Sequence, residues 1–447
     1  MSFYADKQTL DDLNLLGKYK PNSIYSLFNQ VRTAGGEKVL DHLFHAPLTD
    51  AVTINKRSEI FRWFAKTEVE FPVANEQALI MENYLGGGGG ANYIVSAAQI
   101  GRKKLLASVI RDEAFGILYK GLLATIEVLN VFRDFIINLD GQEPMGPYQE
   151  QLESVKRIFA DKRLRWLAWE RRNDKIPLQK VIRYDYLLRQ ALQEEMRILT
   201  DVMYDIDMCI AVSHVGRIRG FSYALALPRE SNLVKAGGLR HPSLAKAVAN
   251  SVSLRQDSNV LFLTGANMAG KSTFMKTFGI SVYLAHMGFP VAADEMVFSV
   301  KDGIYTSINV PDNLNQGYSH FYAEVLRVKK VAEEVTRPLD LYVIFDELFK
   351  GTNVKDAYDA TLTVTQAFAG HRNCFYIIST HIIEVGDVLR QECDNLQFVY
   401  FPTIMKGSIP VYPYTLKEGI TADRHGMMII ENEGILNIIL SREPHRG

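Results

Sequence analysis

The hydrophobic pattern divides the chain into two parts with different periods. Up to about residue 228, apolar residues mostly recur at three- and four-residue steps, as they do at Ile24, Leu27, Val31, Leu40 and Leu43. Such spacing is typical of amphipathic helices. From about residue 229 onward, short β-rich runs alternate with helical segments, which is typical of a sheet covered by helices. We therefore predict an α/β fold in which a mostly helical domain, residues 1–228, precedes a domain with a mixed sheet flanked by helices, residues 229–447.

Two stretches of the helical half qualify this picture. Residues 178–220 keep an apolar stripe over many turns and contain neither Pro nor Gly before Gly216. This pattern predicts a long helix of the kind that acts as a lever or coiled-coil arm. The five glycines Gly86–Gly90 disfavour a helix by about 1 kcal/mol each, so they predict a flexible loop. A phosphate-binding nest is the alternative there, but no strand precedes the glycines and no Lys-Ser/Thr pair follows them.

Composition narrows the class of protein. A chain of 447 residues suits two or three domains, and a formal net charge of −1 gives no global attraction to nucleic acid or to an anionic membrane. Any nucleic-acid binding must then use a local patch. The three cysteines, Cys209, Cys374 and Cys393, lie far apart and form no CxxC pair. They indicate small buried residues in a reducing compartment, in preference to a metal or redox site.

Membrane attachment is not expected. The most apolar stretch, "FGILYKGLLATIEVLNVFRDFIINL", is interrupted by Lys120, Glu127, Arg133 and Asp134, so it predicts a buried helix and not a membrane span. The first residues lack the basic and apolar regions of a signal peptide. We therefore expect a cytoplasmic location.

The stretch "GANMAGKST" has the spacing of a phosphate-binding loop, G-x-x-x-x-G-K-[ST], with Gly265, Gly270, Lys271 and Ser272 at its fixed positions. An apolar strand, residues 260–263, precedes it, and a helical pattern follows. Backbone N–H groups of such a loop wrap phosphates, and the helix N-terminus adds positive potential. We expect Lys271 to reach the β- and γ-phosphates and Ser272 to bind Mg²⁺. The other positions expected to contact the nucleotide are Asn267, Met268, Ala269 and Thr273.

Two further strands end in polar residues that suit nucleotide hydrolysis. The apolar run at residues 341–345 delivers Asp346 and Glu347, of which Asp346 suits Mg²⁺ and Glu347 suits polarising an attacking water. Capping of a neighbouring helix is the alternative role for this acidic pair. The run "CFYIIST" leads into His381, which could sense the γ-phosphate or could be purely structural. Because the carboxyl ends of parallel strands meet at one sheet edge, we expect Lys271, Glu347 and His381 to form the catalytic set.

These motifs resemble those of the MutS family of mismatch-repair ATPases, an ABC-type branch of the P-loop proteins. Here "TGANMAGKST" is similar to the family's T-G-P-N-M-G-G-K-S-T, "DELFKGT" to D-E-x-G-R-G-T, and Thr380-His381 to its T-H pair. The segments "GLRHPSL" and "LKEGITADRHGM" also resemble family motifs, as does the start of the helical half. Between the strands, "NVPDNLNQGYSHFYAEVLRV" is similar to a family segment at Asp312, Leu314, Gly317, Ser319, Phe321 and Glu324.

The resemblance implies an ATPase with ATP and Mg²⁺ as cofactors, working as a homodimer. Each site would take its phosphate loop, acidic pair and histidine from one protomer and Ser319 from the other, in trans. ATP would close the dimer, and hydrolysis would move the levers of a core domain within residues 1–228. The sequence begins almost directly at that core domain, so we expect a DNA-binding repair protein that is structure-selective and does not read mismatches.

The sequence departs from the family pattern at positions that matter for this expectation. Phe349 and Lys350 replace a Gly-Arg pair, Ala269 replaces a glycine, and "AKAVANS" offers no aromatic residue to stack on adenine. For DNA contact the candidate segment is "DKRLRWLAWERRNDK", residues 161–175, whose two tryptophans, Trp166 and Trp169, could stack on bases or could face the core. An ABC-type mechanical ATPase that acts on a protein partner without DNA is the alternative function.

Overall fold

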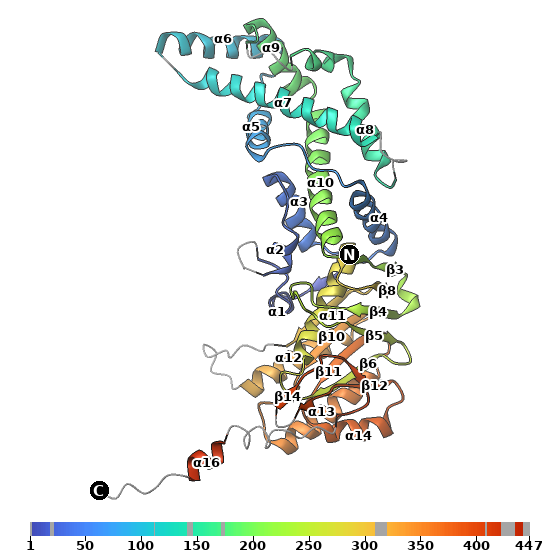
Figure 1. Ribbon diagram of the computed structural model, residues 1–447. Coiled ribbons are helices and arrows are strands. Elements are labelled where there is room, and N and C mark those ends of the chain that lie inside the picture. Colours follow the sequence, from blue (N-terminus) through green and yellow to red (C-terminus); the bar gives the residue numbers. More distant parts are fainter. Residues whose placement is uncertain are drawn as a thin grey trace, which may run out of the picture. The chain divides into compact units, whose positions relative to one another are not determined.

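The computed structural model describes residues 2–17, 22–110, 112–140, 146–170, 175–308, 320–406, 409–421 and 434–440. The chain forms two units, which Figure 1 labels by element. The sheet unit consists of Met1–Leu27, Ala46–Asn55 and Arg219–Gly447, and the helical unit consists of Phe28–His45 and Lys56–Ile218. The combination of a parallel-rich sheet with many helices confirms the predicted α/β class.

A seven-stranded sheet forms the centre of the sheet unit, in the order β1-β9-β10-β11-β6-β12-β15. All neighbours are parallel except β12 and β15. The strands β6 and β11 are buried along their whole length, which explains why the sequence shows them as continuous apolar runs. The bounds are β1 Tyr4–Ala5, β6 Val260–Gly265, β9 Gly303–Ser307, β10 Leu341–Asp346, β11 Phe375–Ser379, β12 Leu396–Phe401 and β15 Lys417–Glu418.

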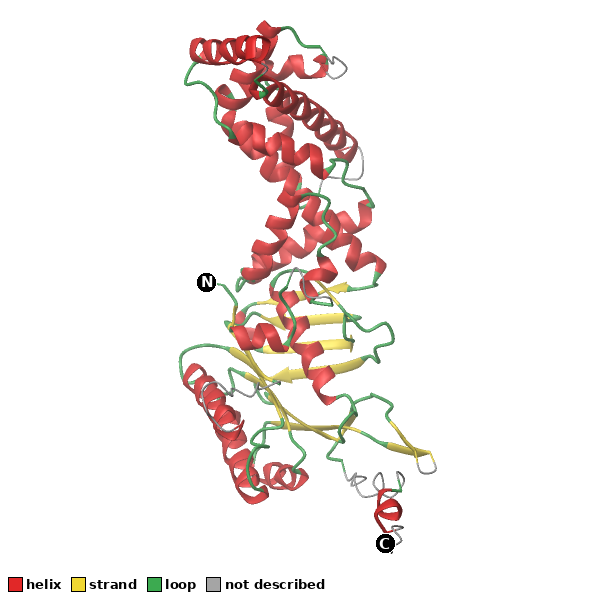
Figure 2. Cartoon of the chain, turned by 90° about the vertical axis from the view of Figure 1, so that its left-hand side faces the viewer, coloured by secondary structure: helices red, strands yellow, loops and turns green. Residues whose placement is uncertain are grey.

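Helices pack beside this sheet, as the red ribbons next to the yellow strands in Figure 2 show. On one side, valines of α12 (Val328, Val331 and Val335) and Phe368 of α13 join strand residues of β10 and β11 in one buried cluster. Burial of such side chains contributes about 1.5–3 kcal/mol each, so this cluster holds α12 and α13 against β10 and β11. The bounds of these helices are α11 Lys271–His286, α12 His320–Val335, α13 Val354–Ala369, α14 Ile383–Glu392 and α16 Ile435–Leu440.

A second, four-stranded sheet has the order β3-β8-β4-β5. Its strands are β3 Leu225–Leu227, β8 Glu295–Ser299, β4 Leu233–Leu239 and β5 Asn250–Arg255, and a short 3₁₀ helix, η4 (Arg229–Ser231), precedes β4. Two small pairs complete the unit: β2 (Ser222–Tyr223) with β7 (Pro290–Val291), and β13 (Ile404–Lys406) with β14 (Ile409–Val411).

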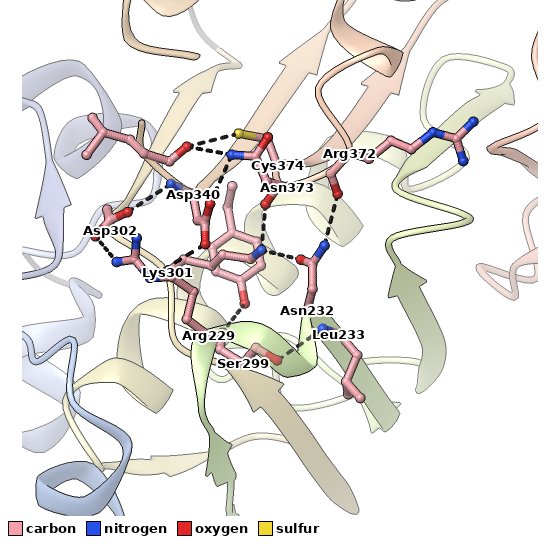
Figure 3. A network of polar contacts seen from close by, with 12 residues as sticks. Arg229, Asn232, Leu233, Ser299, Lys301, Asp302, Asp340, Arg372, Asn373 and Cys374 are labelled. Atoms are coloured by element: carbon pink, nitrogen blue, oxygen red, sulfur yellow. Dashed lines mark hydrogen bonds and ion pairs between the residues drawn. The ribbon is translucent and has the colours of Figure 1, made fainter. Parts of the chain in front are cut away.

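A buried lysine connects the two larger sheets (Figure 3). The Nζ atom of Lys301, whose side chain is fully buried, donates to Oδ1 of Asn232 at 2.5 Å and to the carbonyl of Asn373 at 2.6 Å. The same atom lies 4.2 Å from the ring centroid of Phe375, the first residue of β11. This network therefore lies at the amino end of the parallel strands, opposite the edge where Asp346 ends β10.

The first residues of the chain belong to the sheet unit. The two units change at Ile218 and Arg219, and two earlier segments also belong to the sheet unit. Long-range polar contacts tie the first segment to this unit. Strand β1 pairs with β9, and the next residue, Asp6, forms a buried ion pair with Arg327 and, at 2.7 Å, a partly exposed one with Lys330. Helix α1 (Lys7–Asp12) then ends at Asp12, which accepts from the Thr306 hydroxyl at 2.7 Å.

The helical unit is built around α10. Its Asp207 accepts hydrogen bonds from the backbone N–H groups of Arg32 and Thr33, at 2.9 and 2.8 Å, just before α3 begins. A Cβ at Gly35 would lie 2.2 Å from the Tyr204 ring, so α3 and α10 approach closely there. The bounds of the remaining helices are α2 Ile24–Phe28, α3 Ala34–His45, α4 Ala51–Thr67, α5 Asn75–Gly86, α6 Tyr93–Ile110, α7 Ala114–Asp140, α8 Gln149–Phe159, η1 Lys162–Ala168, α9 Leu178–Tyr186, η3 Leu187–Ala191 and α10 Gln193–Ile218.

Two predictions about this unit need comment. A π-helical turn, η3, interrupts the helix that was expected to be continuous. There the guanidinium group of Arg189 donates to Asp185 at 3.1 Å and to the carbonyl of Gly88. Gly86 ends α5, and residues 87–90 form a loop whose Gly88 carbonyl accepts from Arg189. By length and composition alone, helix α7 is apolar enough to cross a membrane, but 56% of its most apolar part is buried within the structure. The core helices of soluble proteins have the same character.

Candidate nucleotide-binding site

The phosphate loop joins β6 to α11, as the sequence predicted. Its backbone takes left-handed conformations at Gly265 (φ 141°), Met268 (φ 69°) and Gly270 (φ 109°). At Gly265 a Cβ would also lie 2.9 Å from the carbonyl oxygen of Phe401, so the position requires glycine. Alternation of right- and left-handed residues at a helix N-terminus turns N–H groups to one side, which forms a concave site for an anion.

Lys271 lies across this loop. Its side chain is 5% exposed, and its Nζ atom donates to the carbonyl of Gly265 at 2.8 Å and to that of Ala266 at 3.2 Å. Burial lowers the pKa of Lys271, while the nearby Asp346 and Glu347 carboxylates act in the opposite direction. The ammonium group thus donates to two backbone carbonyl oxygens. Phosphate oxygens are acceptors that can take the place of these carbonyls.

Asp346, at the end of β10, receives two hydroxyl groups. Ser272 Oγ donates to its Oδ2 atom at 2.5 Å, and Ser379 Oγ donates to its Oδ1 atom at 2.6 Å. The parallel pairing of Asp346 with Ser379 brings the second contact about. Ser272 and Asp346 therefore offer two adjacent oxygen ligands of the type that Mg²⁺ takes together with phosphate oxygens and water. Among the described residues no group of three or more His, Cys, Asp and Glu side chains is placed to hold a metal ion.

Glu347 contacts two basic side chains, those of His381 and Lys350. Its Oε1 atom lies 2.5 Å from Nε2 of His381, and its Oε2 atom lies 3.5 Å from Nζ of Lys350. The hydrogen bond from His381 is the main cause that lowers the pKa of Glu347 to about 2, assisted by the charges of His381, Lys350 and Lys271 and opposed by burial. Glu347 also adopts a left-handed backbone (φ 57°), which directs its side chain out of the strand.

The loop after this acidic pair packs on the start of α12. Phe349 is 4% exposed, has a left-handed backbone (φ 59°), and lies with its ring 6.2 Å from that of Phe321. A Cβ at Gly351 would approach the Phe321 nitrogen to 2.9 Å. The substitution of the family's glycine by Phe349 thus creates a packing contact. Ser319, expected to act in trans, lies outside the described residues, as do Asp312, Leu314 and Gly317.

A cavity of about 330 Å³ lies beside the phosphate loop. One wall is Tyr414, whose ring is 3.2 Å from where a Cβ of Gly270 would be, and whose carbonyl accepts from Asn250 at 3.0 Å. Tyr414 is 45% exposed and has a left-handed backbone, φ 57°. The segment "AKAVANS" contains no aromatic residue, whereas Tyr414, which is distant from it in sequence, lines the cavity. The aromatic pair Tyr412 and Tyr414 just before "LKEGITADRHGM" was the available signal.

The structure thus brings Lys271, Ser272, Asp346, Glu347 and His381 together at one edge of the sheet. Of the other predicted loop residues, Ala269 is buried, whereas Asn267, Met268 and Thr273 are exposed to solvent at the mouth of the loop. Cys209 and Cys374 are buried and Cys393 is half-buried.

Comparison with known proteins agrees with this geometry. Residues 261–444 match the family model described as MutS domain V. The "DNA mismatch repair protein MutS" of Bacillus cereus strain B4264 is 26% identical over 278 residues, which cover 59% of this chain and 31% of that protein. The protein of the same description from strain Q1 is also 26% identical, with 59% and 30% covered. The chain therefore spans about a third of the length of these curated relatives. The matched region contains all the described residues of the site, from Gly265 to Tyr414, so the site lies in a part of the chain that is similar to MutS domain V.

Proposed function

We propose that this chain is a Mg²⁺-dependent ATPase that binds DNA, with ATP held by the phosphate loop and the cavity beside it. The observation that carries the proposal is the convergence of Lys271, the Ser272–Asp346 pair and the Glu347–His381 pair at the carboxyl ends of neighbouring parallel strands. In α/β sheets this edge is where ligands bind. The cavity beside Gly270 offers Tyr414 as a stacking surface for adenine.

Each side chain has a definite task in this proposal. Lys271 exchanges its two backbone carbonyls for the β- and γ-phosphate oxygens. Ser272 and Asp346 would hold Mg²⁺, which would neutralise charge on the phosphate oxygens. Glu347 accepts a hydrogen bond from the attacking water once it has moved away from His381. His381, released from Glu347, turns its Nε2–H toward the γ-phosphate.

DNA and a second copy of the chain complete the proposal. The relatives are named DNA mismatch repair proteins, and the helical unit supplies long helices, α7 and α10, that suit levers. We take residues 1–228 to include this lever region and residues 229–447 the ATPase. Binding of ATP closes a homodimer in which Ser319 acts in trans, and hydrolysis moves the levers in a cytoplasmic, structure-selective DNA-binding protein. The alternative is a mechanical ATPase that acts on a protein partner without DNA.

ATP hydrolysis with and without DNA separates these functions. The wild-type protein should hydrolyse ATP with Mg²⁺, a four-way junction should stimulate it, and Lys271→Ala should be inactive. Hydrolysis that no DNA stimulates would favour the protein-partner function, and absence of hydrolysis would refute the ATPase.

Competition binding at fixed salt tests the selectivity. It compares perfect duplex, G·T-mismatched duplex and a four-way junction. A preference of more than about tenfold, or roughly 1.4 kcal/mol, for mismatch over perfect duplex would contradict a protein that reads structure alone.

A further inference from the structure

The two tryptophans of residues 161–175 lie in opposite environments, one buried and one exposed to solvent. Trp166 is 8% exposed and stacks on Tyr184, with ring centroids 3.6 Å apart and planes 6° from parallel. Trp169, three residues later, is 80% exposed. Trp63, the third tryptophan of the chain, is 9% exposed. Only Trp169 therefore presents its indole face to solvent, and a single exposed apolar residue needs further observations before it indicates a site.

The backbone on both sides of Trp169 is anchored. Its own N–H donates to the carbonyl of Trp166 at 3.0 Å. Two residues earlier, the carbonyl of the buried Leu167 accepts from Asn130 at 3.0 Å. The next residue, Glu170, is 4% exposed and accepts from Lys180 at 2.7 Å and from the Tyr184 hydroxyl at 2.8 Å. An aromatic ring on a fixed backbone has few torsions left to lose when a ligand covers it, which lowers the entropic cost of binding.

The charges around this ring leave a local positive excess. Arg163 pairs with Asp161, at 2.7 Å, and with Glu195, at 2.8 Å. Together with Lys162 and Arg165, three cations stand against these two carboxylates. Arg165 and Lys162 are exposed and make no ion pair or hydrogen bond in the described part of the chain. In the 3₁₀ helix η1 residues three apart lie above one another, so Lys162 and Arg165 project from one side of the helix, and Trp169, which follows Trp166, lies on the side next to it.

We propose that Trp169 stacks on an unpaired base of DNA while Arg165 and Lys162 contact the phosphates next to it. This inference rests on the proposed DNA-binding function and names its substrate class: DNA with a single-stranded segment, as at a fork or a tailed end. Bases within a duplex already stack on each other, so only an unpaired base can lie on an exposed indole. Stacking on an aromatic side chain tolerates any base, and free cations supply the backbone contact.

Fluorescence anisotropy with labelled oligonucleotides tests the proposal at fixed salt. The probes are a 20-nucleotide oligo(dT), a duplex with a single-stranded tail, and a blunt duplex of the same length. Trp169→Ala should weaken binding of the first two by about tenfold or more, as expected for one lost stacked base, and leave the blunt duplex within about twofold. Trp169→Phe should restore most of the loss. Ile117→Ala, which also removes an exposed apolar side chain of the helical unit, is the matched control and should change nothing.

Two further measurements make the result specific. Oligo(dT) should quench the tryptophan fluorescence of the wild type and not that of Trp169→Phe, because Trp63 and Trp166 are buried. Arg165→Ala should weaken all probes and reduce the salt dependence of binding.

The outcomes separate this inference from the function on which it rests. If the wild type binds none of the three probes, the proposed DNA binding fails and takes the inference with it. If the wild type binds and Trp169→Ala binds equally well, only the stacking role is overturned. Equal losses for tailed and blunt DNA would also overturn it, as would a loss of self-association in Trp169→Ala with unchanged DNA binding, which would assign the ring to a protein contact.

Discussion

The Nε2 atom of His381 lies 2.5 Å from the Oε1 atom of Glu347, across the ends of the neighbouring parallel strands β10 and β11. The carboxylate that suits water activation is therefore already held by a ring nitrogen, and Lys350 at 3.5 Å adds a second restraint. A pKa of about 2 keeps the Glu347 carboxylate ionised throughout the physiological pH range. His381 and Lys350, however, already use part of its capacity to accept hydrogen bonds. In the proposed cycle nucleotide must first separate these two side chains.

Glu347→Gln should keep nucleotide binding and lose turnover. The amide retains the size of the side chain but cannot accept a proton, and general-base catalysis contributes about 10²–10⁴-fold. Single-turnover hydrolysis together with equilibrium ATP binding measures the two effects separately. Glu384→Gln, on α14 after the site, serves as the control. A wild-type hydrolysis rate in Glu347→Gln would show that the assigned role is wrong.

Lys271→Ala should lose nucleotide binding while the protein stays folded. The ammonium group is buried and holds only two backbone carbonyls, so its removal costs the fold little. Loss of charged hydrogen bonds to phosphate, at about 1.5–3 kcal/mol each, predicts at least a 10-fold weaker affinity for ATP. Isothermal titration gives the affinity and a thermal melt gives the stability. Wild-type ATP affinity in this variant would remove Lys271 from the site.

Tyr414→Ala should weaken ATP binding by about tenfold, since stacking of a base on an aromatic ring contributes about 1–3 kcal/mol. Tyr414→Phe keeps the ring and should bind as the wild type does. Inorganic phosphate analogues that lack a base should bind both variants equally. Ile409→Ala, which removes an exposed side chain of β14, is the control. If Tyr414→Ala binds ATP normally, the cavity beside Gly270 does not hold the base.

Two copies of the chain should associate in ATP. Light scattering on Glu347→Gln, which holds ATP without turnover, should report a dimer, and a monomer would contradict the proposed trans role of Ser319. Mixing Lys271→Ala with Ser319→Ala protein should then leave at most one competent site per heterodimer. Activity per site in the mixture checks this expectation.

Stability should rise with pH between about 8 and 10.5 because of Lys301. Burial lowers its pKa from 10.5 to about 8 in the folded protein, so within this window the unfolded chain binds more protons and alkali favours folding. The difference of about 2.5 pKa units corresponds to roughly 3 kcal/mol. Urea unfolding of the wild type and of Lys301→Met at pH 7.5 and 9.5 measures it. The gain for wild type should exceed that of Lys301→Met, and equal gains in both proteins would contradict the assignment.

The sequence predicted those parts of the site that depend on local pattern. The strand before Gly265, the helix at Lys271, and the strands that end at Asp346 and before His381 all lie where the apolar runs placed them. It could not predict contacts between distant segments. Tyr414 reaches Gly270 from about 140 residues further along, and Phe349 contacts Phe321 because two loops meet in space. The π-helical turn at η3 depends on Arg189 finding the carbonyl of Gly88, a contact that no helical period encodes.

The ion pair between Asp6 and Arg327 has a consequence for how the chain is made. The two residues are 321 positions apart, so at a translation rate of about 5–20 residues per second Asp6 is synthesised roughly 15–65 s before its partner. Throughout that interval β1 has no strand to join, because β9 also lies near residue 303. The helical unit is complete by residue 218 and can fold first. The first strand of the nascent sheet unit must therefore wait without a neighbour until β9 is made, and strand edges that stay unpaired during synthesis favour aggregation.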